Sequence, residues 1–220
     1  MIVDYHMHLR APDEQIDHTV EAVEPYVEAV VDAKRRGYPV KLGIEVDYEP
    51  GREAEIAEAL EPYPWDYVIG SIHFLDDLGI DNEPSLVASV GAERAWSRYY
   101  EALGRAAQSG LFDTLAHPDL VKMFGEEIDW DWRAVAASLD GVAIEVSSAG
   151  LHKPHGQLYP SAAFLAAARD RGLPITLASD AHIPQNVGRD LDRAIDHARG
   201  AGYDTVTVFD RREPRQEPLG

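Results

Sequence analysis

Hydrophobic residues recur along the chain in two alternating patterns: short apolar runs, and longer segments with apolar positions three and four residues apart. The first pattern is typical of buried strands and the second of amphipathic helices. The short runs predict strands at residues 2–3, 40–46, 67–73, 114–117, 142–146, 175–178 and 205–209. The longer segments predict helices at residues 20–36, 52–60, 92–109, from about 130, 161–171 and 187–199, and a polar tail with two prolines follows the last strand.

This order of elements alternates strand and helix without a linker or a low-complexity break. Strands that are joined through helices are usually parallel and connected by right-handed crossovers. We therefore expect an α/β fold in which residues 1–220 form a single TIM-like barrel domain. An open doubly wound sheet is the alternative, but no glycine-rich phosphate loop follows the first strand.

The composition restricts the classes of protein that fit this pattern. The chain has 220 residues, 45% of them hydrophobic and 27% charged, which is an ordinary globular balance. No apolar run approaches the length of about 20 residues that spans a bilayer, and we expect a cytoplasmic protein without a membrane partner. Because cysteine is absent, any metal ion must be held by histidine, aspartate or glutamate.

The net charge is −19, from 39 acidic and 20 basic residues. Such a surface repels phosphate backbones, so we expect no nucleic-acid partner. A small anionic substrate is compatible with this charge if metal ions and local basic groups dominate one pocket. Solubility accounts for most of the carboxylates.

Residues that can bind a metal ion fall at corresponding places along the chain. His6 and His8 alternate at the end of the first strand and share one face with Asp4. A single polar residue after a strand is ordinary, but the carboxyl ends of barrel strands meet at one mouth. We therefore expect one shared metal site, because further residues of this kind end the later strands: Glu45, His73, His117, Glu145, Asp180 and His182.

Together these segments resemble the polymerase-and-histidinol-phosphatase (PHP) family, and within it the histidinol-phosphatase branch. The resemblance extends from Met1 almost to Gly220. It rests on His6-x-His8, Gly-Ile-Glu45-Val-Asp, Gly-Ser-Ile-His73-Phe, Ala-His117-Pro-Asp-Leu, Ser-Asp180-Ala-His182 and the segments at residues 145–150 and 158–160.

The resemblance implies a distorted (β/α)7 barrel with two or three divalent metal ions, of Zn, Mn or Fe. The first ion would be bound by His6, His8, Glu45 and Asp180. The second ion would be bound by Glu45, His73 and His117, and a third ion by His182. The implied reaction, in histidine biosynthesis, hydrolyses L-histidinol phosphate to L-histidinol and phosphate. A metal-bridging hydroxide would attack phosphorus in line. We expect Glu45, Asp180 and His182 to be catalytic, Glu145 to ligate or orient, and Asp4 and Asp47 to orient imidazoles.

One departure from the family is a missing strand. The helix at residues 20–36 leads directly to the strand at residue 40, where this branch has a further strand that supplies a histidine to the third ion. The barrel is then shortened by about one βα unit, and Asp13 and His18 are the remaining candidates for the lost ligand. Either the barrel closes with fewer strands, or a second copy fills the gap in a strand-swapped or tightly associated homodimer.

A second departure is His152, which stands where the family commonly has an arginine. His152 and Lys153 are candidates for binding the substrate phosphate, and a solvated loop is the alternative. Two other functions stay open. One is a phosphoesterase acting on nucleotides or other monoesters, and the other is a metal-binding or structural protein without turnover.

Overall fold

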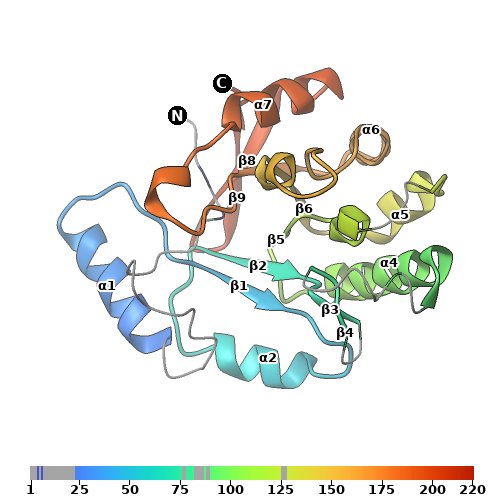
Figure 1. The fold of residues 1–220 in the computed structure, drawn as a ribbon. Coiled ribbons are helices and arrows are strands. Elements are labelled where there is room, and N and C mark those ends of the chain that lie inside the picture. Colours follow the sequence, from blue (N-terminus) through green and yellow to red (C-terminus); the bar gives the residue numbers. More distant parts are fainter. Residues whose placement is uncertain are drawn as a thin grey trace.

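A parallel sheet lies at the centre of the molecule (Figure 1). The computed structural model describes residues 4, 6, 23–75, 78–81, 87, 90–124 and 128–220. Within these residues the sheet has five strands in the order β1-β2-β5-β6-β7, and every neighbouring pair is parallel. The strands are β1 (Gly43–Asp47), β2 (Tyr67–Ser71), β5 (Thr114–Leu115), β6 (Ala143–Ser147) and β7 (Ile175–Ala178). The predicted α/β fold with a parallel sheet is confirmed.

The central strands are continuous apolar runs because they are covered on both faces. All residues of β2, β6 and β7 are buried, as expected for parallel strands between layers of helices. Strand β1 is only half-buried. Gly43 begins it, where a Cβ atom would lie 2.2 Å from the ring of Tyr67, so only glycine lets β1 approach β2 so closely.

Helices alternate with the strands along the chain. Three of them, α4 (Ala92–Gln108), α5 (Trp132–Ser138) and α6 (Ala162–Arg171), lie side by side (Figure 1). Aromatic rings fill their interface, and Trp132 stacks on Phe164 with ring centres 5.3 Å apart. The other helices whose bounds lie within the described residues are α1 (Val23–Arg35), α2 (Glu53–Leu60) and α7 (Leu191–Gly200), with short 3-10 helices at η2 (Leu120–Phe124), η3 (Ala149–His152) and η4 (Pro184–Asn186).

The apparent shortening of the barrel is visible after α1. Residues 36–42 form a turn and a loop that lead directly into β1, so no strand lies between α1 and β1. The hydroxyl of Tyr26 donates to the Gly43 carbonyl (2.7 Å) and fixes α1 beside the start of β1. The predicted first strand, residues 2–3, lies outside the described residues. Barrel closure by that strand therefore stays a prediction.

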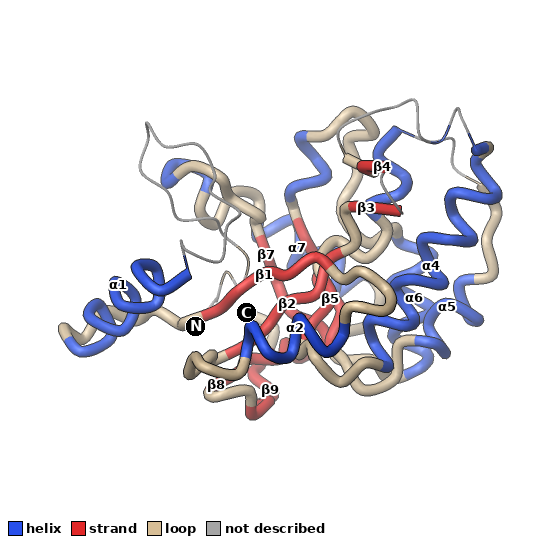
Figure 2. The backbone as a smooth tube through the Cα atoms, turned by 90° about the horizontal axis from the view of Figure 1, so that it is seen from below, coloured by secondary structure: helices blue, strands red, loops and turns tan. Residues whose placement is uncertain are grey.

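The C-terminal part differs from the sequence prediction. The polar tail is not a loop: β8 (Thr205–Asp210) pairs antiparallel with β9 (Glu213–Pro218) in a separate two-stranded sheet. Strand β8 lies against β7 without joining the described parallel sheet. A second hairpin, β3 (Phe74–Leu75) with β4 (Leu78–Gly79), was also not predicted. The two hairpins lie towards opposite ends of the parallel strands (Figures 1 and 2).

Helix α7 begins later than the predicted residue 187. The turn of η4 precedes it, and Gly188 has a positive φ of 75° that interrupts helical geometry. Strand β5 is shorter than the predicted 114–117 because the backbone turns at His117, whose φ is 24°. Among the residues described, none of the helices is both long and apolar enough to cross a membrane.

Buried carboxylates also mark the amino ends of the strands. Asp66 precedes β2 and accepts hydrogen bonds from the Leu42 backbone N–H (2.7 Å) and the Lys34 ammonium (2.6 Å). Asp113 precedes β5 and accepts from the Val68 N–H (2.7 Å). These contacts bind the strand starts to α1 and to one another.

The turn between β8 and β9 closes the same end of the sheet. The Arg212 guanidinium donates to both carboxylate oxygens of Asp113 at 3.0 and 3.1 Å, and to the Leu111 carbonyl at 2.7 Å. The C-terminal hairpin therefore serves as a cover for the amino ends of the strands.

Candidate metal centre

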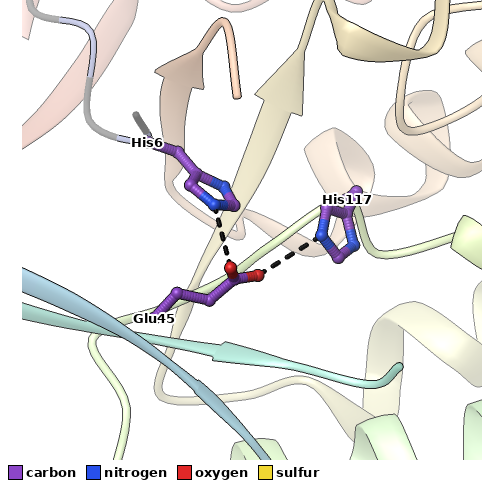
Figure 3. A group of neighbouring side chains, drawn as sticks. All are labelled: His6, Glu45 and His117. Carbon is purple, nitrogen blue, oxygen red and sulfur yellow. Dashed lines mark ion pairs between the residues drawn. The ribbon is translucent and has the colours of Figure 1, made fainter. Parts of the chain in front are cut away.

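Three of the predicted ligands meet at the carboxyl ends of the strands. His6, Glu45 in β1 and His117 after β5 each offer one ligand atom, and these atoms lie within 4.8 Å of one another. Glu45 Oε2 is 3.1 Å from His6 Nε2, and Glu45 Oε1 is 3.4 Å from His117 Nε2. The two imidazoles therefore approach the two oxygens of one carboxylate (Figure 3).

Glu145 in β6 holds two of these groups from behind. Its side chain is fully buried. Its Oε2 accepts from His6 Nδ1 at 2.9 Å, and its Oε1 accepts from the His117 backbone N–H at 3.1 Å. With Nδ1 committed to this carboxylate, His6 directs Nε2 towards Glu45. Of the two roles predicted for Glu145, orientation describes these contacts.

Asp180 and His182 follow β7 and border the same group. Asp180 Oδ1 lies 3.5 Å from His6 Nε2, so it faces the same nitrogen as Glu45. His182 directs Nδ1 to the Asp180 backbone carbonyl (3.0 Å) and keeps 43% of its side chain exposed. The structure therefore places Asp180 in the cluster and His182 at its rim.

His73 reaches the cluster from the end of β2. Its ring lies 5.0 Å from the His117 ring, centre to centre. Its Nδ1 donates to Asp47 Oδ1 at 2.5 Å, and Ser71 Oγ donates to the same oxygen at 3.0 Å. Asp47 thus fixes the orientation of His73, as predicted for it.

The backbone is strained at two of these positions. His117 has a φ of 24° and Asp180 a φ of 49°, in the left-handed region that favours glycine. Non-glycine residues persist there only where surrounding contacts hold them, and such residues cluster at functional sites. The Glu145 contact with the His117 N–H is one of these contacts.

The electrostatics of the cluster favour a cation. Burial lowers the pKa of His6, but the carboxylates of Glu45, Glu145 and Asp180 outweigh it and raise that pKa well above its ordinary value. Burial raises the pKa of Glu45, but His6 and His117 outweigh it and hold that pKa well below its ordinary value. In a site that attracts protons so strongly, a divalent ion can replace them.

The same balance acts on His73. Burial lowers its pKa, but the hydrogen bond to Asp47 and the charges of Glu45, Asp47 and Asp81 raise the pKa to about 9. A metal ion that binds here must displace this proton, so its affinity increases with pH.

The residues present fit a divalent ion. Nitrogen and oxygen ligands lie about 2.0–2.2 Å from zinc, so two ligands of one ion are about 3–4 Å apart. The separations of 3.1, 3.4 and 3.5 Å around Glu45 and His6 agree with this. In addition, the buried Nδ1 of His117 has no hydrogen-bond partner among the residues that the structure describes.

Several predicted residues lie elsewhere. His8, a predicted ligand, and Asp13 and His18 lie outside the described residues. Asp4 was expected to orient an imidazole, and this is wrong: its carboxylate accepts from Ser179 N–H (2.8 Å) and Gly188 N–H (2.9 Å). These contacts instead fasten the loop after β7.

The candidate phosphate-binding residues lie in the loop after β6. His152 is exposed, and its Nε2 lies 2.7 Å from Asp190 Oδ2 at the start of α7. Lys153 is half-buried. The pairing with Asp190 holds His152 between two loops of the mouth. None of the contacts described above joins either residue to the metal cluster, and their role stays a prediction.

Sequence reasoning missed a group of buried residues behind His117. Asp119 and Lys122 pair at 2.9 Å, and Lys122 lies 5.0 Å from the ring centre of Tyr159. Tyr159 in turn meets the His117 ring edge-on, with centres 6.0 Å apart. The signal was a lysine inside the apolar run Leu-Val-Lys-Met, where a surface charge is out of place.

The fold and the cluster define a class: α/β proteins that gather histidines and carboxylates at the carboxyl ends of parallel strands to hold metal ions. Residues 6–149 match the PHP domain family. The chain belongs to this family, as the sequence motifs predict.

Relatives of the chain include two proteins named "Probable histidinol-phosphatase". The one from Deinococcus radiodurans is 40% identical over 182 residues, which cover 79% of this chain and 69% of the relative. The one from Schizosaccharomyces pombe is 23% identical over 193 residues, or 78% of this chain and 63% of the relative.

A solved structure shows the same fold. Histidinol phosphate phosphatase from Lactococcus lactis, in complex with zinc, L-histidinol and phosphate, superposes with a TM-score of 0.71 and 20% identity. The match covers 93% of this chain and 82% of that one.

Proposed function

We propose that this protein is a metal-dependent phosphatase that hydrolyses L-histidinol phosphate to L-histidinol and phosphate, a step of histidine biosynthesis. The observation that carries the proposal is the grouping of His6, Glu45 and His117 within 4.8 Å, bordered by His73 and Asp180. The name of the 40% identical relative supports the substrate.

We propose the ligand set that the family resemblance implies, and the contacts among the described residues support part of it. His6, Glu45 and Asp180, with His8 from outside the described residues, would hold one ion, and Glu45, His73 and His117 a second. The proposed reaction requires two ions, which would be Zn, Mn or Fe. His182 is the candidate ligand of a third ion. When bound, such ions neutralise phosphate oxygens and lower the pKa of a bound water towards about 7.

The remaining residues prepare and complete the reaction. Glu145 keeps His6 Nε2 directed into the site, and Asp47 does the same for His73. His182 lies at the rim beside Asp180, and we propose that it gives a proton to the leaving alkoxide when it holds no third ion. His152 and Lys153 would bind the phosphate group or its neighbour.

The setting of the enzyme is part of the proposal. We propose a cytoplasmic enzyme that forms one domain of residues 1–220 and acts on a small phosphorylated substrate. We propose no nucleic-acid partner, because the net charge is −19. Because the described residues 36–42 between α1 and β1 contain no strand, a homodimer with an exchanged strand is the proposed assembly. A monodisperse monomer in light scattering would refute the dimer while leaving the activity untouched.

Two measurements test the function. Elemental analysis of purified protein should find two or more equivalents of divalent metal. Phosphate release should then be fastest with L-histidinol phosphate in a panel that also holds nucleotides and simple phosphate monoesters. Faster release from a nucleotide would identify a different phosphoesterase. A metal-loaded protein without turnover on any monoester would mean a binding or structural role.

The phosphate-binding residues have their own test. His152→Arg restores the guanidinium that the family commonly carries, which binds phosphate with two parallel hydrogen bonds. We expect the KM for L-histidinol phosphate to fall by about 3- to 10-fold at unchanged kcat. An unchanged KM would remove His152 from the substrate site.

A further inference from the structure

We infer that Lys122 and Asp119 are positioning residues: they hold the segment Leu158–Ser161 against the metal centre, so that the ring of Tyr159 fixes the ring of His117. The inference rests on the proposed function, because it concerns a proposed metal ligand. The two residues act on that ligand through Tyr159 and the turn after His117.

Lys122 is held on all sides. Only 3% of its side chain is exposed. Its ammonium lies 2.9 Å from Asp119 Oδ2 and 2.7 Å from the Leu158 carbonyl oxygen, and it sits 5.0 Å from the ring centre of Tyr159. These three contacts match the three protons of an ammonium group, so the charge has one fixed position.

Asp119 connects two segments that are far apart in the sequence. Its Oδ2 accepts both from Lys122 and from the Ser161 backbone N–H, the latter at 2.7 Å. Asp119 belongs to the turn that begins at His117, where the Leu120 N–H donates to the His117 carbonyl at 2.9 Å. The pair therefore joins the turn that carries His117 to the segment that carries Tyr159.

Tyr159 is fixed at its other end as well. Its backbone exchanges hydrogen bonds of 2.8 and 3.1 Å with Ser147 at the end of β6. Its hydroxyl lies 3.0 Å from His155 Nε2, while His155 Nδ1 accepts from the Gln157 N–H at 3.0 Å. Burial first, and then Lys122, lower the pKa of His155 to about 4, so a neutral His155 donates its Nε2 proton to the hydroxyl.

The ring of His117 needs such a support. Its Nδ1 is buried without a hydrogen-bond partner among the described residues, so no side-chain acceptor on that atom fixes the ring. His6 and His73 each have one, in Glu145 and Asp47. For His117, the edge of Tyr159 at 6.0 Å takes the place of the carboxylate.

A buried ion pair is a costly way to fill space. Removing two charges from water offsets most of their attraction, so such pairs contribute little net stability compared with apolar residues. The lysine is then explained better by the geometry that it imposes than by stability. Its matched control is Lys34, which pairs with the buried Asp66 at 2.6 Å at the opposite end of the sheet.

The test compares Asp119→Asn/Lys122→Met with Lys34→Met. The double variant removes both charges together and keeps an amide oxygen at position 119 that can accept from the Ser161 N–H. Zinc is titrated into each folded protein in competition with a chromophoric chelator. We expect one zinc equivalent to bind about 10- to 100-fold more weakly in the double variant, and both equivalents to be unchanged in Lys34→Met.

A metal-free readout separates this inference from the proposed function. The ring signals of His117 in nitrogen-15 NMR, assigned through His117→Asn, should be single and sharp in the wild type and in Lys34→Met, and shifted or broadened in the double variant. If the wild type binds none of zinc, manganese and iron, the proposed function fails and these signals alone decide the inference.

Two results would overturn the inference: wild-type zinc affinity for both equivalents in the folded double variant, or unchanged His117 ring signals. Should the double variant not fold, Tyr159→Leu takes its place, because it keeps the ion pair and removes the supporting ring. It should show the same loss of zinc affinity and the same altered signals. Wild-type behaviour of Tyr159→Leu would also overturn the inference.

Discussion

The two ends of the parallel sheet both contain buried carboxylates, but these face different cations. At the carboxyl ends, Glu45 and Glu145 face imidazoles. At the amino ends, Asp66 faces the Lys34 ammonium and Asp113 the Arg212 guanidinium, together with backbone N–H groups of the strand starts.

This difference in cations assigns chemistry to the carboxyl ends of the strands and stability to the amino ends. An imidazolium can lose its proton near neutral pH, so a carboxylate–histidine cluster can exchange protons for a metal ion. A guanidinium keeps its proton under all ordinary conditions, and the Arg212–Asp113 pair can only hold the structure together. This is the usual division in parallel α/β barrels, where function collects at the carboxyl face.

The substitution Glu45→Gln should have the largest effect on the candidate metal centre at the carboxyl ends of the strands. The amide keeps the shape of the side chain but not the negative charge that His6 and His117 both face. We expect kcat/KM for L-histidinol phosphate to fall by about 1000-fold or more, and one equivalent of metal to be lost. Steady-state kinetics with elemental analysis measure both, and near-wild-type rates would contradict the role of Glu45.

The pH dependence of stability sharpens the contrast. In chelator-treated protein, the folded-state pKa of His73 is raised to about 9 from an unfolded value near 6.5. Its contribution is therefore fully present below about pH 6.5 and is lost as the pH rises through about 9. The free energy of unfolding should fall across that window, by at most about 3 kcal/mol from His73.

Urea titrations at several pH values between 6 and 10 measure this decline. His73→Gln, treated with the same chelator, should show a smaller one. Zinc-saturated protein should show the opposite tendency, since deprotonated histidines bind the ion more tightly. A flat profile in the chelator-treated wild type would contradict the raised pKa of His73.

The substitution Arg212→Met should destabilise the amino end of the sheet without changing the candidate metal centre at the carboxyl ends. It leaves the Asp113 carboxylate without its guanidinium and the Leu111 carbonyl without a donor. We expect the free energy of unfolding to fall by about 1–3 kcal/mol, with kcat and KM unchanged within about twofold. A loss of activity in the folded variant would show that the two ends are coupled.

The substitution Asp47→Asn should have the smallest effect, because it changes only how firmly the imidazole of His73 is held. The new side chain still accepts through its amide oxygen but carries no charge to favour the His73 Nδ1 proton. We expect about 10-fold weaker metal binding with little change in stability. Isothermal titration with zinc measures the affinity, and Ser71→Ala, which removes only the second contact to Asp47, should have a smaller effect.

The sequence alone was sufficient for the order of the strands in the described parallel sheet and for the ligand candidates. Alternating apolar periods predicted the strands of the central sheet, and β7 matches the predicted residues 175–178. The placement of Glu45, His73, His117 and Asp180 at strand ends was also readable, because parallel strands bring their carboxyl ends to one edge whatever the details of packing.

Other features depended on contacts that no local pattern contains. The tail pairs as β9 only because β8 lies beside it, and its alternation of charged residues and prolines has no strand period. The later start of α7 follows from the contacts of Gly188, whose N–H donates to Asp4 and whose φ of 75° interrupts the predicted helix.

The sequence by itself thus determined the candidate residues for the chemistry: histidines and carboxylates at the ends of apolar runs, in a chain without cysteine. The tertiary structure decided which of them face one another. Glu145 orients His6 and holds the His117 backbone, and each of these two contacts joins residues that are 28 or more positions apart in the sequence. Lys122 supports His117 through Tyr159. Hydrogen bonds of this kind depend on distances and angles in space, and sequence spacing within one element does not encode them.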